Sequence, residues 1–189
     1  MVRIPIWISN RHIHLSAIDA DKLFGKWHVF ETLKDLSQPW EKATKDTLII
    51  QWPKGKIERV RVLVPLRKFT QVEVTIGDAF TLGIEPVIRL SGDLSWTPGI
   101  TIVWPAGSIE IPFGVVVAKR HLHCTVKEAE DMWLKNGDII KIKVWGERGL
   151  VFDSVEVRAN DSYALDFHVD IEEANAASLK SGDRGELVK

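Results

Sequence analysis

The sequence predicts a mainly β protein, either small β-barrels or a sandwich, with short α-helices and an internal repeat. Two observations carry this prediction. Many short segments alternate apolar and polar residues with a period of two, and turn residues separate them. In addition, a histidine motif occurs twice in full and once in part, and each copy precedes a possible helix start.

The strand candidates are rich in β-branched residues, and Gly, Pro, Asn and Asp lie between them. They fall at 60–64, 72–76, 100–104, 109–117, 139–144, 150–158 and 163–169. Short strands at this spacing favour barrels or a sandwich over a doubly wound α/β sheet. Residues at about 25–56 follow no regular pattern and are expected to form an irregular excursion or a small hairpin.

The repeated motif is Asn10-Arg-His-Ile-His-Leu-Ser, which returns as Lys119-Arg-His-Leu-His-Cys-Thr, and a partial third copy begins at His168. In each copy a residue with a capping side chain follows two positions after the last histidine, and an acid follows three positions later. This is the pattern of a helix N-cap with a capping box. The caps are Ser16, Thr125 and Asp170; the acids are Asp19, Glu128 and Glu173; Gly137 and Gly182 are expected to end two of the helices.

Alternate residues of a strand share a face, so His12 and His14 form one pair and His121 and His123 another. Imidazoles roughly 7 Å apart along a strand can bind zinc, copper, nickel or iron. A single such pair is more often two solvated side chains. The repetition and the matching context of His168 favour a metal site, whereas His28 lies outside all three copies.

The residues beside these histidines have simpler expected roles. Arg11 and Arg120 project to the opposite strand face and are expected to pair with carboxylates. Cys124 also points away from His123 and is expected to be a small buried filler. The eight tryptophans are expected to serve packing in the core and at its rim.

Composition limits the function classes. The formal net charge of −1 gives no general attraction to nucleic acid or to an anionic membrane. A single cysteine excludes an intrachain disulfide framework and fits a reducing compartment. No signal peptide and no apolar run of membrane-spanning length is evident, which favours a cytoplasmic protein.

The chain resembles the PduL-type phosphotransacylases (phosphate propanoyltransferases) along nearly its whole length. The matching blocks, which occur in the order and spacing of that family, are 8–16, 64–73, 78–83, 89–93, 118–123 and 168–177. The resemblance implies two small β-barrels packed together, each capped by short α-helices. Residues 1–10 and 119–189 would form one barrel and residues 11–118 the other, with the active site at the barrel interface.

The resemblance also implies a zinc centre with two ions per chain. One ion would be bound by His12, His14 and Glu73, and Arg67 would bind phosphate and act in catalysis. The match extends to Arg89 as a further substrate-binding candidate, although a structural turn explains that block equally well. The ligands expected for the second ion are His121, His123 and His168.

The activity implied is the reaction of a short-chain acyl-CoA, propanoyl or acetyl, with phosphate to give acyl phosphate and coenzyme A. Two alternatives stay open: a dinuclear metallohydrolase, and a non-catalytic scaffold protein stabilised by zinc. A homo-oligomer is compatible with the sequence. Family members of bacterial microcompartments often carry an N-terminal extension, and its absence here favours a free cytoplasmic enzyme.

Overall fold

The computed structural model describes residues 2–188 and divides into two compact units. Unit 1 comprises residues 1–9, 37–39 and 119–189, and unit 2 comprises residues 10–36 and 40–118. The described part is mainly β, as the sequence predicts, with four short helices. None of its helices has both the length and the apolar character needed to span a bilayer.

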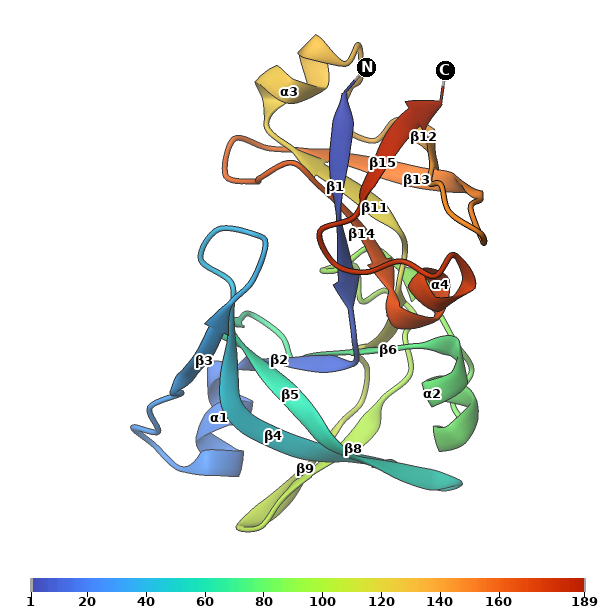
Figure 1. Ribbon diagram of the computed structural model, residues 1–189. Coiled ribbons are helices and arrows are strands. Elements are labelled where there is room, and N and C mark those ends of the chain that lie inside the picture. The colour runs from blue at the N-terminus through green and yellow to red at the C-terminus, as the bar shows by residue number, and fades with distance from the viewer. Residues whose placement is uncertain (1, 189) are drawn as a thin grey trace. The chain divides into compact units, whose positions relative to one another are not determined.

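Unit 1 is a closed six-stranded barrel, and Figure 1 shows its strands. The N-terminal strand β1 pairs with β14 in parallel and with β15 in antiparallel orientation, so both termini of the chain contribute to one barrel. The strands, in barrel order, are β1 (Arg3–Ser9), β14 (Asp166–Asp170), β11 (His121–Cys124), β13 (Val151–Ala159), β12 (Ile139–Lys143) and β15 (Arg184–Val188). Helices α3 (Val126–Asp131) and α4 (Ile171–Ala176) follow β11 and β14.

Unit 2 is a nine-stranded sheet, and its strand order is not closed into a ring. The second barrel that the sequence predicts is therefore not confirmed. The strands in sheet order are β7 (Ile88–Arg89), β10 (Val115–Ala118), β6 (Gln71–Val74), β2 (His12–Ser16), β5 (Gly55–Arg67), β4 (Lys42–Trp52), β8 (Ile100–Trp104) and β9 (Gly107–Ile111), with β3 (Thr32–Asp35) paired to β4. Helices α1 (Ala17–Phe24) and α2 (Ile76–Leu82) follow β2 and β6.

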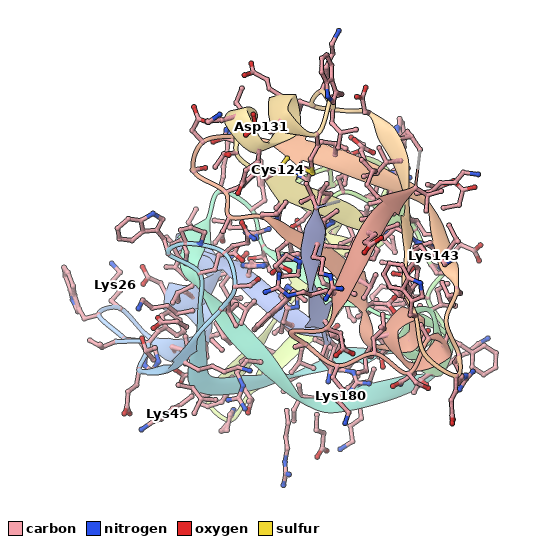
Figure 2. All side chains as sticks on the ribbon, turned by 45° about the horizontal axis from the view of Figure 1, so that its top comes forward. Lys26, Lys45, Cys124, Asp131, Lys143 and Lys180 are labelled. Atoms are coloured by element: carbon pink, nitrogen blue, oxygen red, sulfur yellow. The ribbon has the colours of Figure 1, made fainter. Side chains whose placement is uncertain are left out.

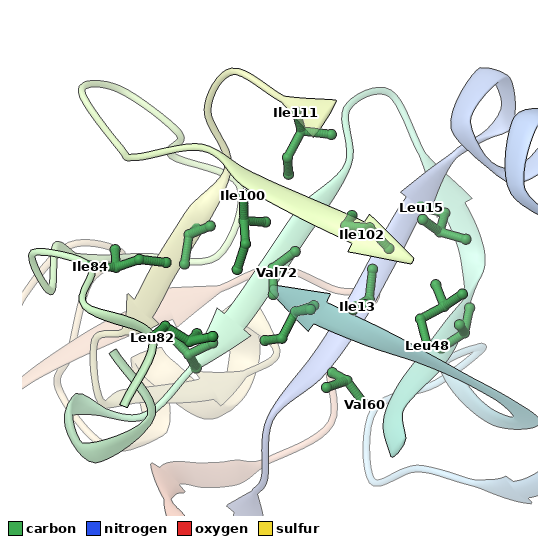
Figure 3. Close-up of a cluster of buried hydrophobic side chains, with 14 of the residues drawn as sticks. Ile13, Leu15, Leu48, Val60, Val72, Leu82, Ile84, Ile100, Ile102 and Ile111 are labelled. Atoms are coloured by element: carbon green, nitrogen blue, oxygen red, sulfur yellow. The ribbon is translucent and has the colours of Figure 1, made fainter. Parts of the chain in front are cut away.

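Each unit has its own apolar core. Isoleucine, leucine and valine side chains from β2, β4, β5, β6 and β8 fill the core of unit 2 (Figure 3). Ile13, Val62 and Ile102 are fully buried there. A separate cluster fills unit 1 and includes Phe167 and Cys124, both fully buried. Figure 2 shows Cys124 on the ribbon of unit 1, while labelled lysines such as Lys26 and Lys45 extend outward.

Two sequence expectations about elements are wrong. Residues 42–52 do not belong to an irregular excursion, because they form the long strand β4 between β5 and β8. The alternative of a small hairpin agrees with the antiparallel pairing of β3 with β4. The alternation of apolar and polar residues is hard to recognise in β4 because one of its buried residues is polar. This residue is Thr44, whose hydroxyl donates to the carbonyl of Val62 at 2.9 Å. In addition, the predicted strand at 109–117 is two strands, since Pro112 and Gly114 interrupt it.

The tryptophans pack only in part as expected: Trp52 and Trp104 lie against the core of unit 2, but four others are almost fully exposed. Trp27, Trp40, Trp96 and Trp133 are 84–93% exposed, and each has a positive φ between 58° and 73°. The expected helix ends also differ. Gly137 and Gly182 have positive φ in the turns before β12 and β15, but the caps of α3 and α4 are Met132 and Ala177.

Candidate metal and phosphate site

Two groups of three side chains could each hold a metal ion, and both consist of residues that the sequence singled out. The potential ligand atoms within each group lie within 4.8 Å of one another. The first group, in unit 2, comprises His12, His14 and Glu73. The second group, in unit 1, comprises His121, His123 and His168.

The strand pairing of unit 2 builds its group. His12 and His14 lie on β2, and their ring centroids are 4.9 Å apart. Strand β6 runs antiparallel to β2 and places Glu73 directly opposite His12. The carboxylate Oε2 of Glu73 is 3.4 Å from Nε2 of His12. All three side chains are buried, so three polar groups converge in a nearly dry position.

Unit 1 repeats this arrangement with a different third residue. His121 and His123 lie on β11 with ring centroids 4.5 Å apart. The antiparallel strand β14 places His168 directly opposite His121, at a centroid distance of 4.9 Å. Tyr163 packs against His123, with ring centroids 4.3 Å apart.

Backbone carbonyls fix the ring orientation of the first histidine in each pair. Nδ1 of His12 is 2.8 Å from the carbonyl oxygen of Asn10, and Nδ1 of His121 is 2.8 Å from that of Lys119. A carbonyl can only accept, so Nδ1 carries a proton in both rings, and Nε2 is the nitrogen left to face a metal ion. Metal-binding histidines are typically oriented through their second nitrogen in this way.

The charges of the unit 2 group are coupled. Burial alone would lower the pKa of His12, but the carboxylate of Glu73 outweighs it and raises this pKa. Burial would raise the pKa of Glu73, but His12, with Arg67 contributing, holds it well below the usual range. Burial and then the neighbouring His12 charge lower the pKa of His14 well below 6.5, so His14 is a neutral imidazole.

The donor set fits zinc. Neutral imidazoles and a carboxylate are zinc ligands, and three protein ligands with an open fourth position are typical of catalytic zinc. Nδ1 of His14 is buried and has no hydrogen-bond partner among the described residues. Burying a polar atom without a partner costs free energy. A bound cation nearby would explain why a polar side chain occupies this position.

Arg67, the last residue of β5, lies close enough to the unit 2 group for its charge to act on all three members. Its Nη1 donates to Oγ of Ser91 at 2.9 Å, and its Nη2 donates to Oε1 of Glu41 at 3.3 Å. The guanidinium is only partly buried, with 29% of the side chain exposed. It can therefore offer further N–H donors to an anion.

Ser91 and Gln71 connect this arginine to Glu73. The sequence left the block that contains Ser91 open between a structural turn and a substrate contact, and it gave Gln71 no role. The hydroxyl of Ser91 donates to Oε1 of Glu73 at 2.8 Å and accepts from Nε2 of Gln71 at 2.8 Å. The same Nε2 donates to Glu73 at 2.6 Å, and the backbone N–H of Gly92 donates to Oε1 of Gln71. Gln71 could have been found from its position two residues before Glu73, on the same strand face.

Arg89 has a different environment. Its guanidinium donates to the backbone carbonyls of Ser95 and Ile88 and lies 3.8 Å from Asp93. These contacts stabilise the turn that contains Arg89, in agreement with the structural explanation of this block. A role of Arg89 in substrate binding stays a prediction.

The two arginines that precede the histidine pairs do pair with carboxylates, as predicted. Arg11 contacts Asp78 through two nitrogens at 2.8 Å each. Arg120 contacts Glu173 at 2.6 Å. Cys124 is also as expected: it is fully buried, and burial raises the pKa of its thiol to about 11, with Glu128 adding to the shift. Such a thiol is not an activated nucleophile.

Comparison with known proteins identifies the family of the chain. The family model for phosphate propanoyltransferase matches residues 5–180. A phosphate propanoyltransferase of Thermotoga maritima is 50% identical over 95% of this chain and 86% of its own length. Proteins of the same name from Rhodopseudomonas palustris and Clostridioides difficile are 45% and 44% identical, over 96% and 98% of this chain and 80% and 89% of their own lengths. The chain belongs to the phosphate propanoyltransferase family, whose members are phosphate acyltransferases.

Proposed function

We propose that this protein transfers a short acyl group, propanoyl or acetyl, between coenzyme A and phosphate, with one zinc ion at each three-residue group. The observation that carries the proposal is the hydrogen-bonded connection from Glu73 through Ser91 to Arg67. It joins a candidate metal ligand to a cation with free donor capacity, which is a suitable arrangement for a substrate that contains phosphate.

In the proposed reaction a phosphate oxygen attacks the thioester carbonyl, the carbon–sulfur bond breaks, and coenzyme A leaves as a thiolate that is then protonated. Arg67 would bind the phosphate oxygens and reduce charge repulsion as the new bond forms. Ser91 and Glu41 hold the guanidinium in place before phosphate arrives. Zinc, when bound, supplies Lewis-acid polarisation of a carbonyl and lowers the pKa of a thiol.

Direct transfer to phosphate is preferred to an acyl-enzyme on the cysteine. Cys124 is fully buried, and its thiol has a pKa of about 11, so it lacks the accessible thiolate that covalent catalysis requires. The acyl group therefore need not be attached to Cys124 during the reaction.

The test is an assay of the purified protein with acetyl-, propanoyl- and butanoyl-CoA, with and without phosphate. Coenzyme A release and acyl phosphate formation are measured together, and zinc is determined on the same sample. The proposal expects both products in equal amounts, only when phosphate is present. Thioester or phosphoester cleavage by water without acyl phosphate would indicate a hydrolase, and zinc without any turnover would indicate a scaffold.

A further inference from the structure

The two metal groups are built on the same strand register, and this register identifies one further residue in each. In unit 2, His12 lies opposite Glu73 and His14 lies opposite Gln71. Gln71 is thus two residues before the third ligand, on the same strand face, and it is 1% exposed.

In unit 1 the corresponding position is Asp166. His121 lies opposite His168, and His123 lies opposite Asp166. Asp166 is two residues before the third ligand and is 4% exposed, so a buried polar side chain occupies this position in both units.

Gln71 provides a hydrogen-bond donor and Asp166 an acceptor, and each matches the candidate ligand beside it. Glu73 is a carboxylate, and the amide of Gln71 donates to it at 2.6 Å. His168 is an imidazole, and Oδ2 of the Asp166 carboxylate lies 3.5 Å from its Nε2. A donor therefore accompanies the anionic ligand, and an acceptor accompanies the imidazole.

Asp166 also has an unused capacity. Its Oδ1 is buried and has no hydrogen-bond partner within residues 2–188. An isolated carboxylate in such a position is unfavourable unless a cation or a donor compensates for it. The three-histidine group has no negative ligand of its own, whereas the unit 2 group has Glu73. Asp166 therefore places a carboxylate beside the three histidines of unit 1, whereas in unit 2 the carboxylate, Glu73, is itself one of the candidate ligands.

We propose that Gln71 and Asp166 are positioning residues for the two metal groups. Gln71 orients the Glu73 carboxylate, and Asp166 orients His168 and offsets the charge of an ion held by the three histidines. This inference rests on the proposed zinc sites and adds residues that neither the histidine motif nor the ligand geometry identifies. Loss of such supporting contacts typically weakens metal binding about 10- to 100-fold.

The test uses two substitutions that preserve size, Gln71→Glu and Asp166→Asn. The first replaces a donor beside Glu73 by a second carboxylate, and the second removes the negative charge beside His168. Matched controls are Gln51→Glu and Asp153→Asn, because Gln51 and Asp153 are exposed. Zinc affinities are determined by competition with a chelator, and thermal melts are recorded on the metal-free proteins. If Gln71→Glu does not fold, Gln71→Leu serves in its place.

Each variant is expected to bind one zinc ion as the parent does and the other about 10- to 100-fold more weakly. The controls should match the parent, and the metal-free Asp166→Asn protein should melt close to the metal-free parent. Parent-like affinity for both ions in either variant would overturn the role of that residue. Equal losses of metal-free stability and of zinc affinity would show a structural role instead. A parent that binds no zinc would refute the proposed metal sites, and this inference with them.

Discussion

Arg67 is the residue that would bind phosphate, and two neighbours determine its position. Ser91 and Glu41 accept hydrogen bonds from it, and Ser91 passes the contact on to Glu73. Glu41 already supplies one anionic partner, at 3.3 Å and with a third of its side chain exposed. A phosphate can accept hydrogen bonds from the remaining N–H donors or displace Glu41, because an exposed ion pair contributes little stability in water.

Arg67→Ala should mainly impair the use of phosphate. Loss of a charge-assisted contact in the transition state costs on the order of 2–4 kcal/mol, which corresponds to about 30- to 1000-fold in rate. Steady-state kinetics with varied phosphate, alongside zinc content, measure the effect. The control is Arg148→Ala, since Arg148 is exposed in a loop of unit 1. Unchanged phosphate kinetics in Arg67→Ala would remove this residue from the site.

The sequence predicts the histidines of the two pairs because strand alternation is a local rule. Gln71 follows the same rule if Glu73 is taken as a ligand. Ser91 could not be predicted, because its contact with Glu73 depends on how the loop after β7 folds over β6. The partner of Arg120 is likewise set by tertiary structure, since Glu173 belongs to another copy of the motif.

At the scale of elements, the structure contains a fourth copy of the strand-to-helix motif. Strand β6 ends near Glu73, Thr75 caps α2, and Asp78 completes the capping box. In each unit the arginine before the histidine pair contacts the capping-box acid of the helix that follows the antiparallel strand. Sequence reasoning missed this copy because glutamate stands in place of histidine.

These arginine contacts should stabilise the end of β2. Arg11 contacts Asp78 through two nitrogens, and Asp78 is 6% exposed. A double-mutant cycle with Arg11→Ala and Asp78→Asn should give a coupling on the order of 1–2 kcal/mol in the free energy of unfolding, above the usual value for exposed pairs. Asp78→Asn also changes the capping box of α2. This effect is present in both the single Asp78→Asn variant and the double variant, so it cancels in the coupling energy.

The exposed pair of Lys127 and Asp131 on α3 is the matched control, and its coupling should be below about 0.5 kcal/mol. Equal couplings for the two pairs would mean that the Arg11 contact contributes nothing beyond an ordinary surface ion pair.

Most regular elements follow from the sequence, and the exceptions have physical reasons. Strand β4 was missed because threonines and lysines interrupt its apolar pattern, and its buried Thr44 is accommodated only by a cross-strand contact. Helices α3 and α4 end before Gly137 and Gly182 because Trp133 and Ser178, with φ of 61° and 54°, already adopt the left-handed conformation that glycine usually takes after a helix.

At the scale of the whole molecule, each unit has its own apolar core and one group of potential metal ligands. The core of unit 2 does not depend on the ligands, since its buried isoleucines and valines pack against one another (Figure 3). Removal of one ligand should therefore impair metal binding more than folding. This separates a catalytic role of zinc from a purely structural one.

The most direct test is to remove zinc with a chelator and add it back while following acyl phosphate formation. The account predicts that activity is lost without metal and rises to a plateau at about two zinc ions per chain. His14→Ala should fold cooperatively but bind less zinc and stay inactive, whereas His28→Ala, whose ring stacks on Phe24 and lies near Asp46, should match the parent. Full activity in the zinc-free protein, or an active His14→Ala, would contradict the central claim.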